Sequence, residues 1–316
     1  MTSHQRHYDV VVIGAGAAGL TAAVMLARTK LQVLVVALRD RFNSAAEGVR
    51  NLPYAEGIAP SDLYGTMERT AIGYGVRFVW DEARTASATD DLVTVATREN
   101  GEFTADRLLL ATGPVTDLPA WLPEGTWGKR VFECPFCHTY ENDGDHFACV
   151  GAGRETLGMA LMSVQYAATM TAVIRDEEAA AGPLADRLRA RGGTVLVDEV
   201  ATASTLAGGE IEMVTKGGVT LTAGAILLTG VKQPAVRFAE TLGLELNERG
   251  GARTLVSGRT SHPRVWSAGS ANAPSFFLWT GAASSGQNAA QSICEDIAFG
   301  PLQSSYWQEL GRTASS

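Results

Sequence analysis

The sequence predicts an α/β protein built from two doubly wound, Rossmann-like units. Apolar runs typical of buried parallel strands end in glycines and continue into helical segments rich in small residues. This pattern occurs near residue 14 and again near residue 151, which makes an internal repeat of about 137 residues. The length of 316 residues also allows about two domains of roughly 150 residues each.

The first unit opens with a strand at residues 8–13 (YDVVVI), a helix at residues 20–30 and a second strand at residues 31–37. Further strands are expected at residues 76–80, 91–97 and 102–113, the last of which ends in a glycine turn. The stretch 114–128, rich in proline and tryptophan, is expected to link this unit to the next.

Residues 146–176 repeat the order strand, glycine turn, helix and strand, and so begin the second unit. Later strands are expected at residues 193–197, 210–215, 219–230 and, after a second linker, 261–270. The final helix, residues 284–300, is long and rich in small residues.

Composition and charge exclude several classes of protein. Hydrophobic residues make up 46% and charged residues 19% of the chain, so a disordered chain is excluded. The net charge of -8 and the lack of a Lys/Arg cluster make nucleic acid an unexpected partner. Apolar stretches are interrupted well before the roughly 20 residues that a membrane helix needs. The N-terminus runs straight into a strand without an apolar signal region, so we expect a cytoplasmic protein with no membrane association.

The first glycine turn, GAGAAGL, has the G-x-G-x-x-G spacing of a dinucleotide-binding fingerprint. Gly14 permits the tight turn, Gly16 lets backbone amides approach a pyrophosphate, and Gly19 lets the helix lie close to the strand. Because a strand precedes it and a helix follows, dinucleotide binding is favoured over a plain tight turn. Ala37 replaces the acidic residue expected at the end of the second strand, and Asp40 is the candidate to replace its ribose contact.

The second glycine turn, GAGRETLG, departs further from the fingerprint. Thr156 stands where a small residue normally allows close packing, and the following strand ends in Arg175 and then three carboxylates. These carboxylates would repel the 2′-phosphate of NADPH and disfavour NADH less. Two interpretations stay open: an intact nicotinamide site and, favoured here, a structural domain that has lost this ligand.

Two of the four cysteines, Cys134 and Cys137, form a CxxC motif within VFECPFCHTYE. At the start of a helix this spacing brings the sulfurs within bonding distance, and the helix end lowers the pKa of the more exposed thiol. In a reducing compartment such a pair indicates redox or metal chemistry. A zinc site would need His146 and Cys149 as further ligands, but Cys149 lies in an apolar strand, where we expect it to be buried. We therefore expect disulfide chemistry and no metal.

The N-terminal fingerprint, the CxxC that opens the second unit and the return of the chain to the first unit together resemble the low-molecular-weight thioredoxin reductase family. The resemblance covers nearly the whole chain. It implies an FAD-binding domain of residues 1–117 and 238–316, an inserted NADPH-domain-like Rossmann domain of residues 118–237 that carries the CxxC, and a homodimer. The motif CPFCHTYE resembles the CPYCHGYE pattern of one branch, the FAD-dependent dithiol oxidases of disulfide-containing natural products such as holomycin, gliotoxin and romidepsin.

The resemblance assigns roles around the cysteines. It implies that Cys134 is the exchange thiol that faces substrate and that Cys137 is the thiol next to the flavin. His138 stands where ordinary thioredoxin reductases have an acidic residue, and it would act with Glu141 as acid and base, since histidine titrates near neutral pH. A structural role is the alternative for His138. For Tyr140 we expect core packing.

The resemblance also implies a set of FAD-binding residues around the pyrophosphate, in the following loop and at two later turns. They are Gly14, Gly16, Ala17, Ala18, Gly19, Asn43, Asn51, Ala111, Thr112, Gly113, Gly269 and Ser270.

The C-terminal part of this predicted FAD site departs from the family pattern. The family's Ala-Gly-Asp motif, whose Asp holds the ribityl chain, ends here in Ser270. The Arg-Gln-Ala opening of the last helix is replaced by a stretch around Phe277, Leu278 and Trp279. Each lost hydrogen bond to a charged group would cost about 1.5–3 kcal/mol. Ser270 can still form a hydrogen bond, and Trp279 can restore packing against the flavin ring.

These observations lead to one functional prediction and two alternatives. The prediction is a flavoprotein that oxidises a small-molecule dithiol to an intramolecular disulfide through the CxxC, with dioxygen as electron acceptor and hydrogen peroxide as product. The enzyme alternative is an NAD(P)H-dependent reductase of thioredoxin or a small disulfide. The other alternative is a non-catalytic relative that has kept the fold and lost FAD.

Overall fold

The computed structural model describes residues 6–235, 237–255, 257–272 and 278–300. Contacts divide the chain into two compact units. Unit 1 comprises residues 1–42, 61–115 and 234–316, and unit 2 comprises residues 43–60 and 116–233. The segment 43–60 therefore groups with unit 2, whereas the family resemblance assigns it to the FAD domain.

Unit 1 contains a seven-stranded sheet in the order β3-β2-β1-β6-β5-β4, with β17 paired to β6. Its strands are β1 (His7–Ile13), β2 (Val33–Ala37), β3 (Arg77–Trp80), β4 (Ala83–Ala88), β5 (Val93–Thr97), β6 (Glu102–Leu110) and β17 (Val265–Ser267). The strands β3, β2, β1, β6 and β17 run parallel, and β4 and β5 extend the sheet in antiparallel fashion. Ile13 pairs with Leu110, so the turns that follow β1 and β6 lie at the same edge of the sheet.

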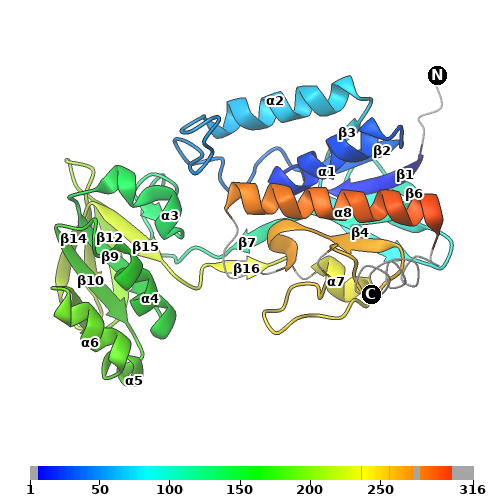
Figure 1. Ribbon diagram of the computed structural model, residues 1–316. Helices are drawn as coiled ribbons and strands as arrows, with labels where there is room; N and C mark the ends of the chain where they lie inside the picture. The colour runs from blue at the N-terminus through cyan, green and yellow to red at the C-terminus, as the bar shows by residue number, and fades with distance from the viewer. Residues whose placement is uncertain (1–5, 236, 256, 273–277, 301–316) are drawn as a thin grey trace, which may run out of the picture. The chain divides into compact units, whose positions relative to one another are not determined.

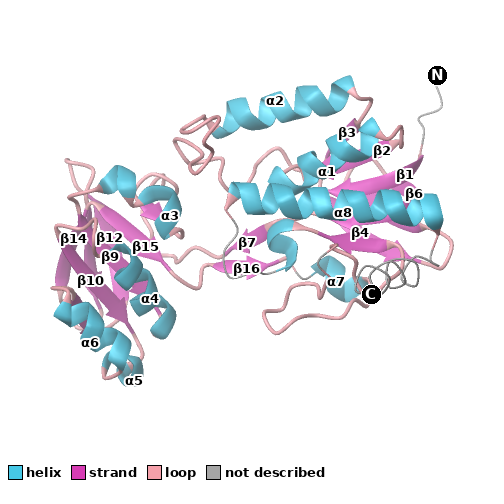
Figure 2. Ribbon diagram, in the orientation of Figure 1, coloured by secondary structure: helices cyan, strands magenta, loops and turns pink. Residues whose placement is uncertain are grey.

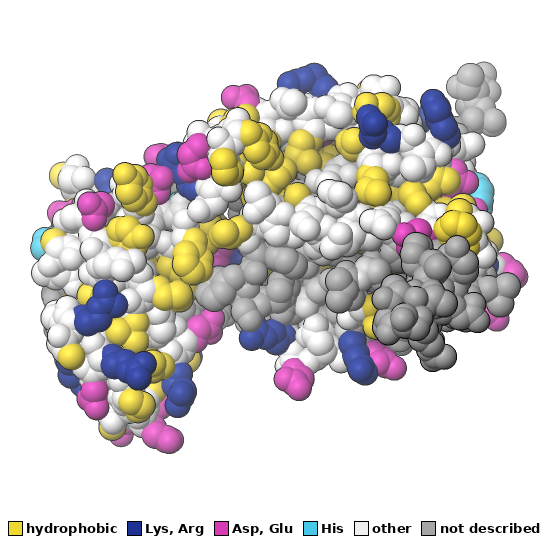
Figure 3. Space-filling view, in the orientation of Figure 1, with side chains coloured by type: hydrophobic (Ala, Val, Ile, Leu, Met, Phe, Trp, Pro, Cys, Tyr) yellow, Lys and Arg dark blue, Asp and Glu magenta, His cyan; other side chains and the backbone are white. Residues whose placement is uncertain are grey.

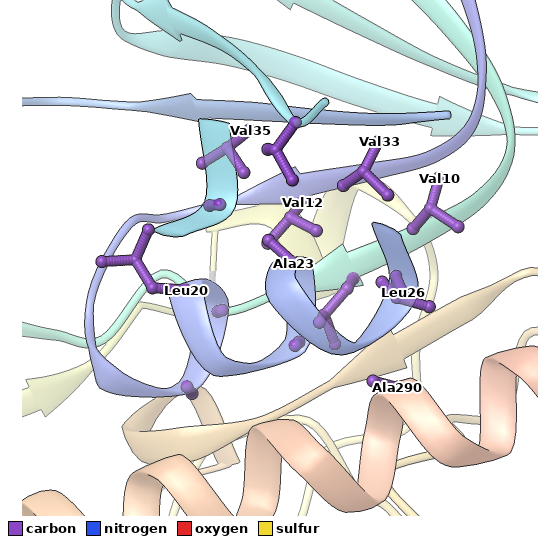
Figure 4. Close-up of a cluster of buried hydrophobic side chains, with 14 of the residues drawn as sticks. Val10, Val12, Leu20, Ala23, Leu26, Val33, Val35 and Ala290 are labelled. Carbon is purple, nitrogen blue, oxygen red and sulfur yellow. The ribbon is translucent and has the colours of Figure 1, made fainter. Parts of the chain in front are cut away.

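The helices of unit 1 are α1 (Ala17–Arg28), α2 (Pro60–Gly73), α7 (Arg237–Thr241) and α8 (Trp279–Phe299). Figure 1 shows α1 and α8 side by side. They approach closely because Gly286 lacks a side chain: a Cβ there would lie 2.1 Å from the carbonyl oxygen of Ala18. Figure 4 shows the core between these helices and the sheet, where Val12, Leu26 and Ala290 are fully buried.

Unit 2 contains a five-stranded sheet in the order β11-β10-β9-β15-β8 and a three-stranded antiparallel sheet, β12-β13-β14. The strands are β8 (Val131–Phe132), β9 (His146–Gly151), β10 (Thr169–Ile174), β11 (Thr194–Val197), β12 (Val200–Thr205), β13 (Ile211–Thr215), β14 (Thr220–Ala223) and β15 (Ala225–Leu228). The helices are α3 (Pro135–His138), α4 (Arg154–Ser163), α5 (Glu177–Ala180), α6 (Pro183–Ala190) and the 3-10 turn η1 (Tyr140–Asn142). All pairs in the five-stranded sheet are parallel.

Both faces of the parallel sheet of unit 2 are covered. One face packs Cys149 against Leu157 and Leu188 of the helices, and the other packs Ile226 against Ile211 and Met213 of the antiparallel sheet. Two covered faces explain why the parallel strands read as continuous apolar runs.

The structure corrects two strand assignments. The single strand expected at residues 219–230 is two strands in different sheets, β14 and β15, with Gly224 between them. A Cβ at Gly224 would lie 2.8 Å from the carboxylate of Asp145. The missing side chain therefore lets the backbone pass close to Asp145 where the chain moves from one sheet to the other. The predicted linker 114–128 begins with a strand, β7 (Pro114–Thr116), which pairs with β16 (Lys232–Pro234), as Figure 2 shows.

The predicted fold class, α/β with two Rossmann-like units, is confirmed. On the face in Figure 3, Lys and Arg side chains are interspersed with Asp and Glu. Within the described residues, no helix is both long and apolar enough to cross a membrane.

Candidate active site

The two cysteines of the CxxC motif are joined by a disulfide in unit 2. Cys134 is the N-cap residue of α3, and Pro135 occupies the first helical position, where the missing N–H costs no hydrogen bond. The Cα atoms of Cys134 and Cys137 lie 5.5 Å apart. Cys134, the predicted exchange thiol, is 7% exposed, whereas Cys137 is half-buried. We call α3 the redox helix.

His138 ends the redox helix and is held flat against an aromatic ring. Its imidazole stacks on Phe132, with ring centroids 4.1 Å apart and planes 14° apart. The pKa of His138 is lowered to about 4: burial is the main cause, a hydrogen bond with the backbone of Cys134 opposes it, and the Arg50 guanidinium adds a smaller lowering effect. Its Nδ1 is buried and has no hydrogen-bond partner among the described residues. His138 is therefore neutral at physiological pH, with a ring nitrogen free to accept a proton.

Glu141 lies in η1, directly after the redox helix, and is paired with a residue that the sequence analysis missed. Its Oε1 lies 2.9 Å from Nε of Arg50, and both side chains are partly exposed. No motif or periodicity marks Arg50, because the contact joins residues far apart in the sequence. The negative charge of Glu141 is thus compensated.

The two asparagines predicted to bind FAD lie in the segment 43–60, within unit 2. Nδ2 of Asn51 donates a hydrogen bond of 2.9 Å to the carbonyl oxygen of Phe136, the residue between the two cysteines. The carbonyl oxygen of Asn43 accepts a backbone hydrogen bond from Ala46. The structure thus shows Asn51 bound to the redox helix, and FAD contacts by either asparagine stay predictions.

A polar cleft of about 520 Å³ opens beside His138 and Glu141 in unit 2. Phe132 and Arg50 also line it, and its other charged lining residues are Glu47, Glu124, Lys129 and Arg130. Both signs of charge occur around the cleft, and neither cysteine lines it. The cleft therefore gives the two candidate acid–base residues a route to solvent that is separate from the disulfide.

The core packing expected for Tyr140 is wrong. Its side chain is 78% exposed because η1 turns it outward, while the neighbouring Thr139 and Asn142 are buried. Thr139 donates a hydrogen bond to the carbonyl oxygen of Pro135, and Asn142 donates one to that of His138. These polar side chains close the turn in place of an apolar one.

Cys149 lies in β9 and is fully buried, as the sequence predicted. Its Sγ is 3.8 Å from Sδ of Met170, and burial raises the pKa of its thiol. The other proposed zinc ligand, His146, contacts the hydroxyl of Thr169 through Nδ1. Across the described part of the chain, no group of three or more His, Cys, Asp or Glu side chains is placed to hold a metal ion.

The first glycine turn joins β1 to α1 in unit 1. Gly14 has φ of 112°, and a Cβ there would lie 2.1 Å from the carbonyl oxygen of Ala111. A Cβ at Gly19 would lie 2.0 Å from the carbonyl oxygen of Gly14. Gly16, by contrast, has nothing within 4 Å of its Cβ position, and no side chain caps the helix that starts after it. The turn thus leaves open space at a helix N-terminus with Ala17 and Ala18 in its first turn.

The later turns of the predicted FAD site lie in the same unit. Ala111 follows β6 and donates its backbone N–H to Ile13, and Gly113 has φ of 69°. Thr112 lies between them. Gly269 has φ of 68°, and a Cβ there would lie 3.0 Å from Cβ of Ala18. Chain segments far apart in the sequence therefore converge on the first glycine turn.

Comparison with known proteins identifies the family. Residues 8–286 match the pyridine nucleotide-disulphide oxidoreductase family. The chain belongs to this family. Among solved structures, HlmI has a TM-score of 0.83 and 26% sequence identity over 99% of both chains. A putative thioredoxin reductase TrxB from Bacillus anthracis has the same TM-score at 23% identity and covers 92% of this chain and 98% of that one.

Curated relatives of this pyridine nucleotide-disulphide oxidoreductase match a smaller share of the chain than these structures do. The bifunctional thioredoxin reductase/thioredoxin of Mycobacterium leprae is 28% identical over 56% of this chain and 40% of its own length. The thioredoxin reductase of Treponema pallidum is 29% identical over 46% of this chain and 48% of its own. The matched part of the chain therefore spans about half the length of these relatives.

FAD is the cofactor of the thioredoxin reductases in the pyridine nucleotide-disulphide oxidoreductase family. The first glycine turn fits such a dinucleotide, because Gly16 leaves space where a pyrophosphate would lie and the first-turn amides of α1 point to it. Ser270 is half-buried in the 3-10 turn η2 (Gly269–Asn272), and Trp279 begins α8. Of the replaced stretch, Phe277 lies outside the described residues.

The ribose position at the end of β2 departs from the fingerprint in an unexpected way. Ala37 is buried and Asp40 is exposed. The side chain that reaches the glycine turn is Arg41, whose Nε donates a 2.8 Å hydrogen bond to the carbonyl oxygen of Ala15 and which also pairs with Glu68. This places a cation at the turn that would hold a pyrophosphate.

The second glycine turn of this family member is occupied by its own side chains. Thr156 is fully buried, and its hydroxyl lies 2.7 Å from the hydroxyl of Thr229. Asp176, after β10, caps α5 by accepting a 2.9 Å hydrogen bond from the N–H of Ala179. A Cβ at Gly153 would lie 2.7 Å from a carboxylate oxygen of Asp176, so this negative charge lies against the turn.

Proposed function

We propose that the protein oxidises a small-molecule dithiol to an intramolecular disulfide, with the Cys134–Cys137 disulfide as immediate oxidant. The observation that carries this proposal is the formed disulfide at the start of the redox helix, next to a neutral histidine. The motif CPFCHTYE, which resembles that of the dithiol oxidase branch, and the full-length match to HlmI support it.

In this proposal a substrate thiolate attacks Sγ of Cys134, a new S–S bond forms and the Cys134–Cys137 bond breaks. The second substrate thiolate then attacks the substrate sulfur of the mixed disulfide, which releases the cyclic disulfide and leaves both cysteines reduced. The neutral ring of His138 accepts a proton at Nδ1, and Glu141 helps to exchange it with the cleft. The chemistry that FAD supplies when bound is transfer of the electron pair from the reduced cysteines to dioxygen, with release of hydrogen peroxide.

The choice of dioxygen over a nicotinamide rests on the second glycine turn. A 2′-phosphate and a pyrophosphate would meet Asp176 close to Gly153, and at contact distance each carboxylate–phosphate pair costs on the order of 1 kcal/mol even in a watery setting. Thr156 is also bonded to Thr229 where a smaller residue would normally sit. Both features favour an oxidase that works without NADPH. The proposal includes a homodimer in the cytoplasm.

The second candidate is an NAD(P)H-dependent reductase of thioredoxin or another disulfide. It is favoured by the names of the curated relatives, several of which are thioredoxin reductases. Measuring dioxygen consumption with dithiothreitol as probe dithiol tests the proposal, because an oxidase consumes one dioxygen per dithiol. A reductase would consume NADPH with an added disulfide and leave dioxygen largely untouched.

A further inference from the structure

Two consecutive residues of the segment 43–60 contact the redox helix and the turn that follows it. The side chain of Asn51 binds the carbonyl oxygen of Phe136, between the cysteines, and the side chain of Arg50 binds Glu141, just beyond His138. Each contact measures 2.9 Å. In the sequence the two contacts lie on either side of Cys137 and His138.

The segment that carries these two residues is anchored independently of the helix. Val49 and Leu52, on either side of the pair, are buried. Val49 exchanges backbone hydrogen bonds of 2.9 Å with Ile58 and Gly57, and the N–H of Leu52 binds the Glu56 carboxylate. Arg50 and Asn51 therefore project from a loop that other contacts already hold in place. Little further conformational entropy is lost when their side chains make these contacts.

Local backbone geometry favours both contacts. Asn51 has φ of 61°, a left-handed conformation that asparagine tolerates better than most residues. Gly57 has φ of 75°, and a Cβ there would lie 2.6 Å from Nη1 of Arg50. The missing side chain at Gly57 thus makes room for the guanidinium.

We propose that Arg50 is a positioning residue for thiol–disulfide exchange: its ion pair with Glu141, together with the Asn51 contact, holds the redox helix and the turn after it in place, and its positive charge disfavours a second proton on the His138 ring. This inference rests on the proposed function of the Cys134–Cys137 pair. Besides Arg50 and Glu141, the charged residues that line the cleft together with His138 are Glu47, Glu124, Lys129 and Arg130. Burial is the main cause that lowers the pKa of His138, and Arg50 is the cation that lowers it in the same direction.

The test follows the first half-reaction alone, reduction of the Cys134–Cys137 disulfide by dithiothreitol under nitrogen, measured by alkylating and counting the new thiols. Arg50→Gln should move the acid limb of the rate–pH profile to higher pH, and a move of about one pH unit would slow exchange about twofold near pH 5 and far less near pH 8. Arg50→Lys keeps the charge and should restore the acid limb. Asn51→Ala should slow exchange similarly at both pH values, because it removes a tether and no charge.

Arg189→Gln is the matched control, since it breaks an exposed pair with Asp186 on α6 of the same unit and should leave the profile unchanged. A histidine NMR titration of Arg50→Gln should show a raised His138 pKa. An unchanged acid limb and an unchanged His138 titration in Arg50→Gln would overturn the proposal. If Arg50→Gln does not fold, Arg50→Lys decides, because it keeps the charge: an unchanged His138 titration would support the proposal, and a raised His138 pKa would refute it.

These outcomes are independent of the electron acceptor. If the protein is a reductase, dioxygen consumption fails while the Arg50 effect on dithiol exchange persists. If the oxidase proposal holds and the Arg50 effect is absent, only the positioning role is refuted.

Discussion

The ring of His138 lies on the ring of Phe132 at a centroid distance of 4.1 Å, and this stack covers one face of the half-buried histidine at the end of the redox helix. Burial is the main reason that the pKa of His138 falls to about 4. The histidine is thereby kept as a proton acceptor across the physiological range.

The stack predicts a pH-dependent loss of stability. Between about pH 6.5 and 4 the unfolded chain protonates His138 and the folded chain does not, so the free energy of unfolding falls as pH falls through this window. The full effect is up to about 3 kcal/mol. His138→Phe keeps the aromatic stack and removes the titration. Urea unfolding should therefore show the variant losing less stability than wild type between pH 7 and 4; parallel curves would contradict the buried, neutral histidine.

The disulfide relay predicts different behaviour for the two cysteines. Cys134→Ser and Cys137→Ser should each lower peroxide production from a dithiol at least a hundredfold, because neither variant can form the internal disulfide. Cys137→Ser should also trap a mixed disulfide on Cys134, detectable by mass spectrometry of the intact protein. Trapping on Cys137 in the Cys134→Ser variant, and not on Cys134, would reverse the roles, a result that the low exposure of Cys134 makes worth testing.

The remaining cysteines should not matter for turnover. Cys149→Ala and Cys294→Ala should keep near wild-type rates, since Cys149 is buried against Met170 and Cys294 lies on α8 in unit 1. Cys149→Ala should cost about 1 kcal/mol of stability through a small cavity. Stoichiometric zinc that disappears together with activity in Cys149→Ala would establish a metal site instead.

The first glycine turn predicts that Gly16→Ala separates FAD binding from folding. Its Cβ position is empty and its φ of -82° suits alanine, so the protein should fold normally. The new methyl group would occupy the space that a pyrophosphate needs, so the ratio of FAD to protein in the purified variant should fall severalfold. Gly73→Ala, also with nothing within 4 Å, is the control. Equal FAD content in both variants would show that the dinucleotide does not lie over Gly16.

Local patterns in the sequence were sufficient to predict most of the fold. Apolar runs and glycine turns repeat at a fixed distance, and both β1–α1 and β9–α4 follow them. The CxxC spacing likewise predicted a bonded pair. In each case the interacting residues lie near one another in the chain.

The parts that could not be predicted depend on contacts between distant residues. Asn51 and Phe136 are 85 residues apart, and Arg50 and Glu141 belong to the same two segments. The exposure of the Tyr140 side chain could not be predicted from the neighbouring sequence, because its position is fixed by the hydrogen bonds of Thr139 and Asn142. Arg41 could not be chosen over Asp40 without knowing where the loop after β2 runs.

The most direct test of the proposed oxidase is anaerobic mixing of the FAD-loaded protein with a dithiol and, separately, with NADPH. The buried Thr156–Thr229 contact and the Asp176 carboxylate beside Gly153, both at the second glycine turn, predict no rapid reaction with NADPH. Dithiothreitol should bleach the flavin once, and the colour should return only when air is admitted. Rapid bleaching by micromolar NADPH, with no bleaching by the dithiol, would contradict the oxidase and establish a reductase.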